Sequence, residues 1–148
     1  MIDRFSTFTV LVDRLKRVIR KIKTEEVAEF DLKSPHVSCL YYLQRYGTMT
    51  SKELAEICDE DKAAVSRSLD YLESNGYVLC KSDMPKRYKS PFILTVKGKE
   101  VATLIVAKID RVLDLSSIGL TEEERETVYR GLAIIAENLE RIYNTHEE

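Results

Sequence analysis

The sequence has little of what interrupts helices or builds disulfide-linked folds. It holds five glycines, three prolines, three cysteines and no tryptophan in 148 residues. So few glycines and prolines favour long helices joined by short turns. The odd number of cysteines has no metal-ligand spacing, and thiols stay reduced in the cytosol. No disulfide framework is expected.

Membrane and export signals are missing as well. No apolar run approaches the roughly 20 residues that span a bilayer. The N-terminal stretch MIDRFSTF has neither the basic n-region nor the apolar h-region of a secretory signal. We therefore expect a cytoplasmic protein without a membrane partner. The length suits one well-buried domain, residues 1–148, better than two.

Catalytic motifs are missing too. The sequence contains no glycine-rich phosphate loop, no HExxH and no GxSxG, and its carboxylates fall at helix caps and on polar helix faces. We therefore expect neither an enzyme nor a cofactor. The formal net charge of −2 excludes a protein that is basic overall. Any nucleic-acid binding must therefore come from a local basic patch.

Apolar residues at helical spacing, together with capping residues, predict six helices. The first runs from about residue 8 to 24, and the fifth from about 97 to 115. The other four are bounded by end signals: Ser34 to Gly47, Thr50 to near Asp59, Asp61 to Gly76, and Thr121 onward.

Between the fourth and fifth helices the pattern changes to two short β-prone runs. YVLCKS and FILTV flank DMPKRYKSP, which predicts a two-stranded ribbon with a long basic tip. Pro91 has no N–H, so the return strand should lie at an edge or begin after this residue. Residues 81–99 carry six basic side chains and one acidic side chain. Residues 59–73 carry five acidic side chains and two basic ones, so any attraction to nucleic acid would have to come mostly from the ribbon.

Helix, short helix, turn, helix and basic ribbon is the order of a winged helix-turn-helix. Successive helical residues are rotated by about 100°. If Val65 is at the centre of the buried side of the fourth helix, then Ala63, Ser66 and Arg67 point outward. Alanine lets the backbone approach a groove, serine can hydrogen-bond phosphate or a base edge, and arginine can bind guanine bidentately. A polar helix face is, taken alone, more often simply solvated. The glycine stop and the basic ribbon favour the DNA reading.

The first helix and the last two have amphipathic patterns without an obvious partner inside the chain. Isolated helices gain most of their stability by packing an apolar face. We therefore expect these helices to pack against a second copy, giving a homodimer.

The segment LAEICDEDKAAVSRSLDYLESNGYV resembles the MarR family of bacterial transcriptional regulators. The family's wing signature Asp-x-x-Asp-Arg-Arg, leading to Leu-Thr-x-x-Gly, matches in spacing over residues 83–98. Lys86 stands where the second aspartate is usual, and Tyr88 where the second arginine is usual. The resemblance is strongest over residues 30–98. It implies a mainly α fold with a small β-wing, a winged helix-turn-helix lobe at about 34–96, and a dimerisation lobe at about 1–33 plus 97–148.

The resemblance also implies function. It indicates a sequence-specific DNA-binding regulator, expected to be a repressor that a small-molecule effector releases from a pseudo-palindromic operator. Asp83 should support the wing arginine Arg87, which enters the minor groove in relatives. The predicted DNA-binding residues are Thr50, Ser51, Lys52, Lys62, Ala63, Ser66, Arg67, Lys86, Arg87, Tyr88 and Lys89.

Three alternatives remain open from the sequence. A winged helix can serve as a protein-interaction module without touching DNA, and the acidic fourth helix keeps that reading alive. A zinc-responsive regulator is suggested by His36 and Cys39, three apart on one helix. A redox-responsive one would use Cys39, Cys58 or Cys80, although all three are expected in the core first. Aromatic side chains could line an effector pocket or simply fill the core: Phe5, Phe8, Tyr41 and Tyr42.

Overall fold

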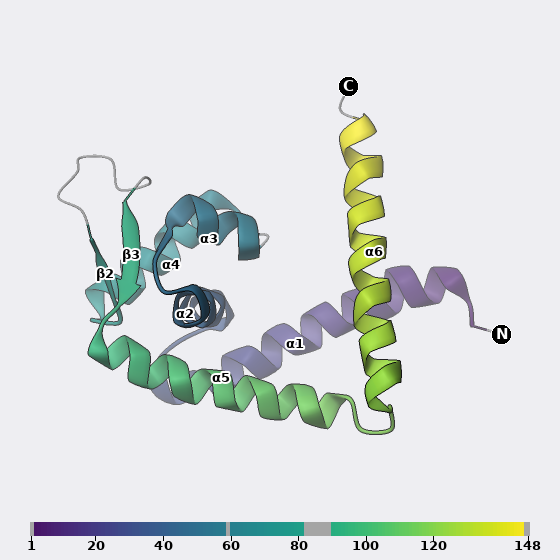
Figure 1. Cartoon of the computed structure of the whole chain (residues 1–148), viewed down its shortest axis with the longest axis horizontal. Coiled ribbons are helices and arrows are strands. Elements are labelled where there is room, and N and C mark those ends of the chain that lie inside the picture. Colours follow the sequence, from purple (N-terminus) through teal and green to yellow (C-terminus); the bar gives the residue numbers. More distant parts are fainter. Residues whose placement is uncertain (1, 59, 82–89, 147–148) are drawn as a thin grey trace. The chain divides into compact units, whose positions relative to one another are not determined.

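The computed structural model describes residues 2–58, 60–81 and 90–146 (Figure 1). Two compact units make up the chain, Met1–Ile109 and Asp110–Glu148. In chain order the elements are a π-helical turn η1 (Ser6–Leu11), α1 (Val12–Glu26), a 3-10 turn η2 (Ala28–Phe30), α2 (Ser34–Tyr46), β1 (Met49–Thr50), α3 (Ser51–Cys58), α4 (Lys62–Ser74), β2 (Val78–Cys80), β3 (Pro91–Leu94), α5 (Val96–Ser116) and α6 (Glu122–His146).

Reciprocal capping hydrogen bonds fix the starts of α3 and α6, as the sequence predicts. The Thr50 N–H donates to Glu53 Oε2 at 2.7 Å, and the Glu53 N–H donates to Thr50 Oγ1 at 3.2 Å. Thr121 and Glu124 form the same pair of bonds at 2.7 and 3.2 Å. Each pair satisfies backbone donors that have no partner inside the helix.

Helix α2 begins differently from the prediction. Its N-cap is Lys33, and Ser34 is the first helical residue, with Pro35 in the first turn. The side chain three positions on takes the capping role, because His36 Nδ1 accepts the Lys33 N–H at 2.9 Å. The other end agrees with the sequence, since Gly47 follows the helix with φ 84°.

Helix α4 has the predicted bounds. Asp61 is its N-cap, and the side chain accepts the Ala63 N–H at 3.3 Å. Val65, Leu69 and Leu72 are buried as expected. The chain then turns through Gly76, whose φ of 79° is a conformation that side chains with a Cβ rarely adopt.

The small sheet corrects two expectations. It has three antiparallel strands in the order β1-β3-β2, because Met49 and Thr50 pair with the start of β3. The return strand β3 is therefore central and begins at Pro91 itself. Proline fits there because it is the first residue of the strand and supplies an acceptor: its carbonyl receives the Lys81 N–H at 2.8 Å. A two-residue strand is too short to show alternation in the sequence.

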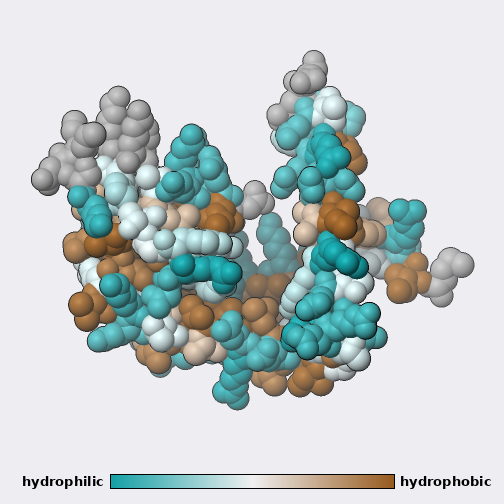
Figure 2. All heavy atoms as spheres, viewed as in Figure 1, coloured by the Kyte–Doolittle hydropathy of each residue, from teal (hydrophilic) through white to brown (hydrophobic). Residues whose placement is uncertain are grey.

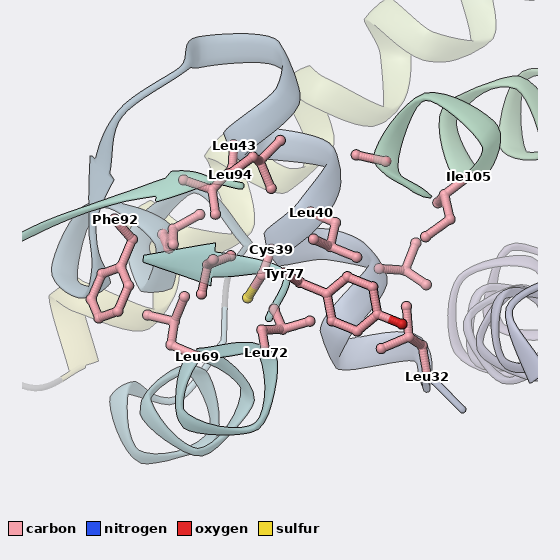
Figure 3. Close-up of a cluster of buried hydrophobic side chains, with 14 of the residues drawn as sticks. Leu32, Cys39, Leu40, Leu43, Leu69, Leu72, Tyr77, Phe92, Leu94 and Ile105 are labelled. Carbon is pink, nitrogen blue, oxygen red and sulfur yellow. The ribbon is translucent and has the colours of Figure 1, made fainter. Parts of the chain in front are cut away.

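One hydrophobic core organises the first unit. Leu40, Leu72 and Ile105 come from α2, α4 and α5, and each is fully buried. Figure 3 shows side chains from these helices converging with Phe92 and Leu94 of β3. This core holds the buried side of α4 in place and leaves the opposite side of the helix exposed.

The start of α5 is fixed by a close backbone approach. Thr95 Oγ1 accepts the Gly98 N–H at 3.0 Å and donates to the Gly76 carbonyl at 2.6 Å. A Cβ added at Gly98 would lie 1.9 Å from the Tyr77 carbonyl oxygen. Glycine at this position therefore lets α5 pack directly on the turn between α4 and β2.

The second unit begins at Asp110, so it contains the last two turns of α5 and all of α6. Helix α6 has no buried residue among those described. Figure 2 shows hydrophobic side chains among hydrophilic ones along this helix. Its exposed apolar side chains include Val128, Leu132, Leu139, Ile142 and Tyr143. Across the described ranges, no helix combines the length and apolar character needed to cross a bilayer.

We predict that Gly98→Ala lowers the free energy of unfolding by about 1–3 kcal/mol, because the added methyl group meets rigid backbone. Denaturant unfolding followed by circular dichroism measures the change. Gly131→Ala is the matched control, because nothing lies within 4 Å of a Cβ there and alanine favours a helix interior. Equal effects of the two substitutions would contradict the close approach.

Candidate nucleic-acid interface

The outward face of α4 carries the residues that the sequence assigns to it. Lys62, Ala63, Ser66 and Arg67 are exposed, whereas Val65 is buried on the opposite side. Within the described residues, the Arg67 guanidinium forms no ion pair. Its five N–H donors are thus available to a ligand outside the chain.

The structure brings five of the predicted site residues together in one surface groove. Ser51 and Lys52 begin α3, and Lys62 and Ala63 begin α4, so the groove lies between two helix N-termini. The fifth lining residue is Ser66, one turn into α4. Helix N-termini carry partial positive charge and favour phosphate, and two lysines reinforce that field. The groove therefore has the chemistry of a site for an anionic backbone.

Thr50 is placed differently from the residues that follow it. It is half-buried, and its hydroxyl also donates to Glu53 Oε2 at 3.1 Å. This side chain is engaged in capping α3. It acts on the groove by holding Ser51 and Lys52 at the start of that helix.

The acidic residues near the groove accept hydrogen bonds from backbone N–H groups at the helix starts. The Asp61 carboxylate accepts the Ala63 N–H, and the Glu53 carboxylate accepts the Thr50 N–H. Carboxylates at helix N-termini are stabilised by the helix dipole and offset part of its positive charge. A plain count of charges over residues 59–73 therefore overstates the repulsion that a phosphate meets at the first turn of α4.

The tip of the wing falls outside the described residues. Asp83, Lys86, Arg87, Tyr88 and Lys89 are all in this segment, so their predicted roles stay predictions. The strands on either side are described: Cys80 pairs with Phe92 across the ladder.

Burial makes two of the cysteines poor nucleophiles. Burial raises the pKa of the Cys39 thiol to about 12 and that of Cys58 to about 11. Cys39 is buried as expected, whereas Cys58 and Cys80 are half-buried. Thiolate is the form that reacts with oxidants and binds metal. His36 Nδ1 already accepts the Lys33 N–H, and the described residues contain no cluster of three metal-ligating side chains.

The four aromatic residues considered for an effector pocket separate into two groups. Phe5 and Phe8 are exposed, by 71% and 43%. Tyr42 meets Tyr41 edge-on at 5.1 Å and stacks with Tyr46 at 6.2 Å. Tyr42 packs against the buried core, which favours the core reading for this residue, whereas Phe5 and Phe8 lie outside that core.

Sequence reasoning missed the contacts that hold the second half of α4. The Tyr71 hydroxyl donates to the Asp31 carbonyl at 2.6 Å, and Lys97 Nζ donates to the Asn75 carbonyl at 2.8 Å. These pairs are 40 and 22 residues apart in the chain. Tyr71 at a partly polar position of the helix was a signal that its hydroxyl has a partner. No feature of the neighbouring sequence indicated that the partner is Asp31.

Comparison with known proteins agrees with this geometry. The profile of the MarR family matches residues 30–87. The uncharacterized HTH-type transcriptional regulator YwoH of Bacillus subtilis is 33% identical over 115 residues, covering 78% of this chain and 83% of that protein.

Solved structures show the same fold. NMB1585, a MarR family regulator from Neisseria meningitidis, superposes with a TM-score of 0.82 at 19% identity, covering 98% of this chain and 99% of that chain. A MarR family transcriptional regulator from Listeria monocytogenes, complexed with 26mer DNA, gives a TM-score of 0.81 at 22% identity, covering 94% and 90%. With its helix-turn-helix and three-stranded wing, this chain belongs to the MarR family of winged helix transcriptional regulators.

Proposed function

We propose that the protein binds a specific double-stranded DNA operator, with α4 in the major groove and the wing tip on the adjacent backbone or minor groove. The observation that carries this proposal is the groove between α3 and α4, which gathers Ser51, Lys52, Lys62, Ala63 and Ser66 beside the exposed Arg67. Arginine reads guanine, and the small side chains let the helix approach the bases. The DNA-bound Listeria relative of the same fold supports the assignment.

The operator is proposed to be pseudo-palindromic, because the acting species is proposed to be a homodimer. Helices α1 and α6 have no buried residue among those described, although both carry apolar side chains. A second copy covering these faces would remove them from water. Two copies of α4 would then meet successive major grooves, about 34 Å apart on one side of the duplex.

Repression with release by a small-molecule effector is the regulatory mode that we propose, by analogy with the family. An effector that binds one spacing of the two α4 helices better than another shifts the population between them. Couplings between sites are typically about 1–3 kcal/mol. The resulting change in operator affinity would be about 5- to 150-fold.

The alternative is a protein-interaction module that uses the same outward face. The acidic side chains of α4 favour this alternative, whereas the lysines of the groove favour DNA. Salt separates the two, because DNA binding releases counterions and weakens steeply as salt rises. Titration at two salt concentrations against the promoter of the protein's own gene is therefore the first experiment.

We predict that Arg87→Ala weakens binding to operator and scrambled duplexes alike and reduces the salt slope by about 0.9 per lost phosphate contact. Arg67→Ala should instead cost about 1–3 kcal/mol of discrimination at one base pair per half-site. Fluorescence anisotropy on both duplexes measures these changes. Arg130→Ala removes the same charge from α6 and should change neither affinity. Unchanged binding by both test variants would contradict the proposed interface.

The homodimer gives a second prediction. Leu139 lies on α6 with 58% of its surface exposed, and an aspartate there would place charge in the proposed interface. Leu139→Asp should convert the dimer to monomers in light scattering and abolish cooperative operator binding. Asn138→Asp adds the same charge at the next position and should leave the dimer intact. A wild-type protein that scatters as a monomer would refute the assembly.

Thiol chemistry gives a third prediction, which tests the redox-responsive alternative. In a Cys80→Ser background, iodoacetamide at pH 7.5 should label Cys39 and Cys58 at least roughly 100-fold more slowly in the folded than in the unfolded protein, because burial suppresses the thiolate. Mass spectrometry reads the labelling. Rapid labelling accompanied by loss of DNA binding would favour the redox-responsive regulator instead.

A further inference from the structure

The connector, residues 27–33, joins α1 to α2 and is held unusually firmly for a link between helices. Val27 and Leu32 are buried in the core. Asp31 adopts a left-handed conformation with φ 57° and ψ 37°. A residue other than glycine seldom occupies this region unless its surroundings stabilise it. Contacts from another element hold Asp31 in this conformation.

Helix α4 supplies the closest of these contacts. The Tyr71 hydroxyl donates to the Asp31 carbonyl oxygen at 2.6 Å and lies 3.3 Å from Asp31 Oδ2. The Tyr71 ring stacks on the His36 ring, with centroids 4.4 Å apart and planes inclined by 12°. A directional bond and a flat contact together define both where the ring lies and how it is turned.

The surface that Tyr71 stacks on is itself fixed. His36 Nδ1 accepts the Lys33 N–H at 2.9 Å and so caps α2. Accepting this bond requires an unprotonated Nδ1. Burial lowers the pKa of His36, and the nearby Lys33 ammonium lowers it further, which keeps the ring neutral near pH 7. The connector and the start of α2 thus present one rigid face to α4.

Other elements hold the connector from different directions. The Tyr77 hydroxyl donates to the Phe30 carbonyl at 3.3 Å, and Figure 3 shows this hydroxyl directed toward the segment that carries Leu32. Lys108 Nζ of α5 pairs with Glu29 Oε1 at 2.7 Å and donates to the Glu26 carbonyl at 3.2 Å. Tyr71 is distinguished from these groups because it belongs to α4 itself.

The apolar core fixes where α4 lies, and a directional bond narrows the small rotations that remain. Val65, Leu69 and Leu72 hold the helix against the core, but apolar contact by itself is not directional. A hydrogen bond loses strength steeply as its angle departs from linear. Tyr71 lies four residues after Arg67, one turn along α4, so its restraint acts next to the outward face.

We propose that Tyr71 is a positioning residue for operator recognition. Its hydroxyl, held by the Asp31 carbonyl, fixes the rotation of α4 and hence the direction in which Arg67 and Ser66 meet the bases. The same bond carries displacements of α1 into α4 through the connector. This inference rests on the proposed function, since it assigns a role within specific DNA binding.

The test compares operator and scrambled duplexes in fluorescence anisotropy titrations of the full-length protein, with the operator obtained by selection from random duplexes. Tyr71→Phe keeps the ring and its stacking but removes the hydroxyl. We expect operator affinity to fall roughly 5-fold per half-site, the usual effect of one hydrogen bond. Affinity for the scrambled duplex should stay within roughly 2-fold of wild type, because non-specific affinity comes from counterion release at phosphates and needs no fixed alignment of α4 with the base edges.

A second readout separates positioning from simple stabilisation. Operators with the half-site spacing changed by one base pair should be discriminated less sharply by Tyr71→Phe than by wild type, since α4 can then rotate to follow the shifted bases. A role confined to stability would move the thermal midpoint and leave this spacing profile unchanged.

Two control variants alter the same kind of contact as Tyr71→Phe, namely a polar side-chain group at the connector. Tyr77→Phe also deletes a hydroxyl bound to the connector, but Tyr77 lies in the turn after α4, just before β2, and the effect on operator affinity should stay under roughly 2-fold. Asp31→Asn keeps the backbone carbonyl that accepts the shorter bond, so it should bind like wild type. These variants hold the side-chain volume nearly constant.

Each outcome decides the inference. Selective loss in Tyr71→Phe, together with a flattened spacing profile, supports it. Equal loss on both duplexes, equal loss in Tyr77→Phe, or wild-type behaviour of Tyr71→Phe overturns it while leaving the proposed function standing. A wild-type protein that shows no preference for any selected duplex overturns the proposed function, and the inference with it.

Discussion

The bond between Thr95 and the Gly76 carbonyl, with Gly98 packed on the Tyr77 carbonyl, ties α4, the wing strands and α5 into one rigid piece. Helix α4 ends at this junction, β2 leaves it, and β3 returns to it. A side chain at position 98 would separate α5 from the turn. The direction of the wing strands relative to α4 is therefore decided by backbone contact at Thr95 and Gly98, three residues apart.

Acidic and basic side chains near the groove have separate roles, because the carboxylates cap helices and the lysines are exposed. Carboxylates at Glu53 and Asp61 satisfy backbone donors at two helix starts, while Lys52 and Lys62 beside them are exposed. A chain with a net charge of −2 can therefore present a locally positive groove. Attraction to an anionic ligand depends on the local charge at the groove. The negative net charge of the whole chain mainly weakens non-specific binding of anions elsewhere on its surface.

Local chemistry made the helices predictable. Capping pairs three residues apart, such as Thr50 with Glu53, and glycine stops such as Gly76 act within one turn, so their signals are visible in a short stretch of sequence. The outward face of α4 followed from helical periodicity alone. Strand β1 has only two residues and no periodicity, and the bond from Tyr71 to Asp31 joins residues 40 positions apart. Contacts of that kind depend on the packed fold, and no local pattern predicts them.

The contrast between α1 and α4 gives the connector its importance. Helix α1 buries no residue among those described and is tied to α2 near its end, where Lys23 Nζ donates to Ser38 Oγ at 3.0 Å, whereas α4 is locked into the core through Leu69 and Leu72. The seven residues of the connector, which include the left-handed Asp31, join α1 to α2, and the bond from Tyr71 links this connector to α4. Because packed cores shift between discrete arrangements instead of deforming smoothly, a displacement of α1 is either absorbed by the connector or passed to α4. The buried Val27 and Leu32 leave little room for absorbing it. The firmness of this link therefore favours coupling between displacements of α1 and the exposed side chains of α4.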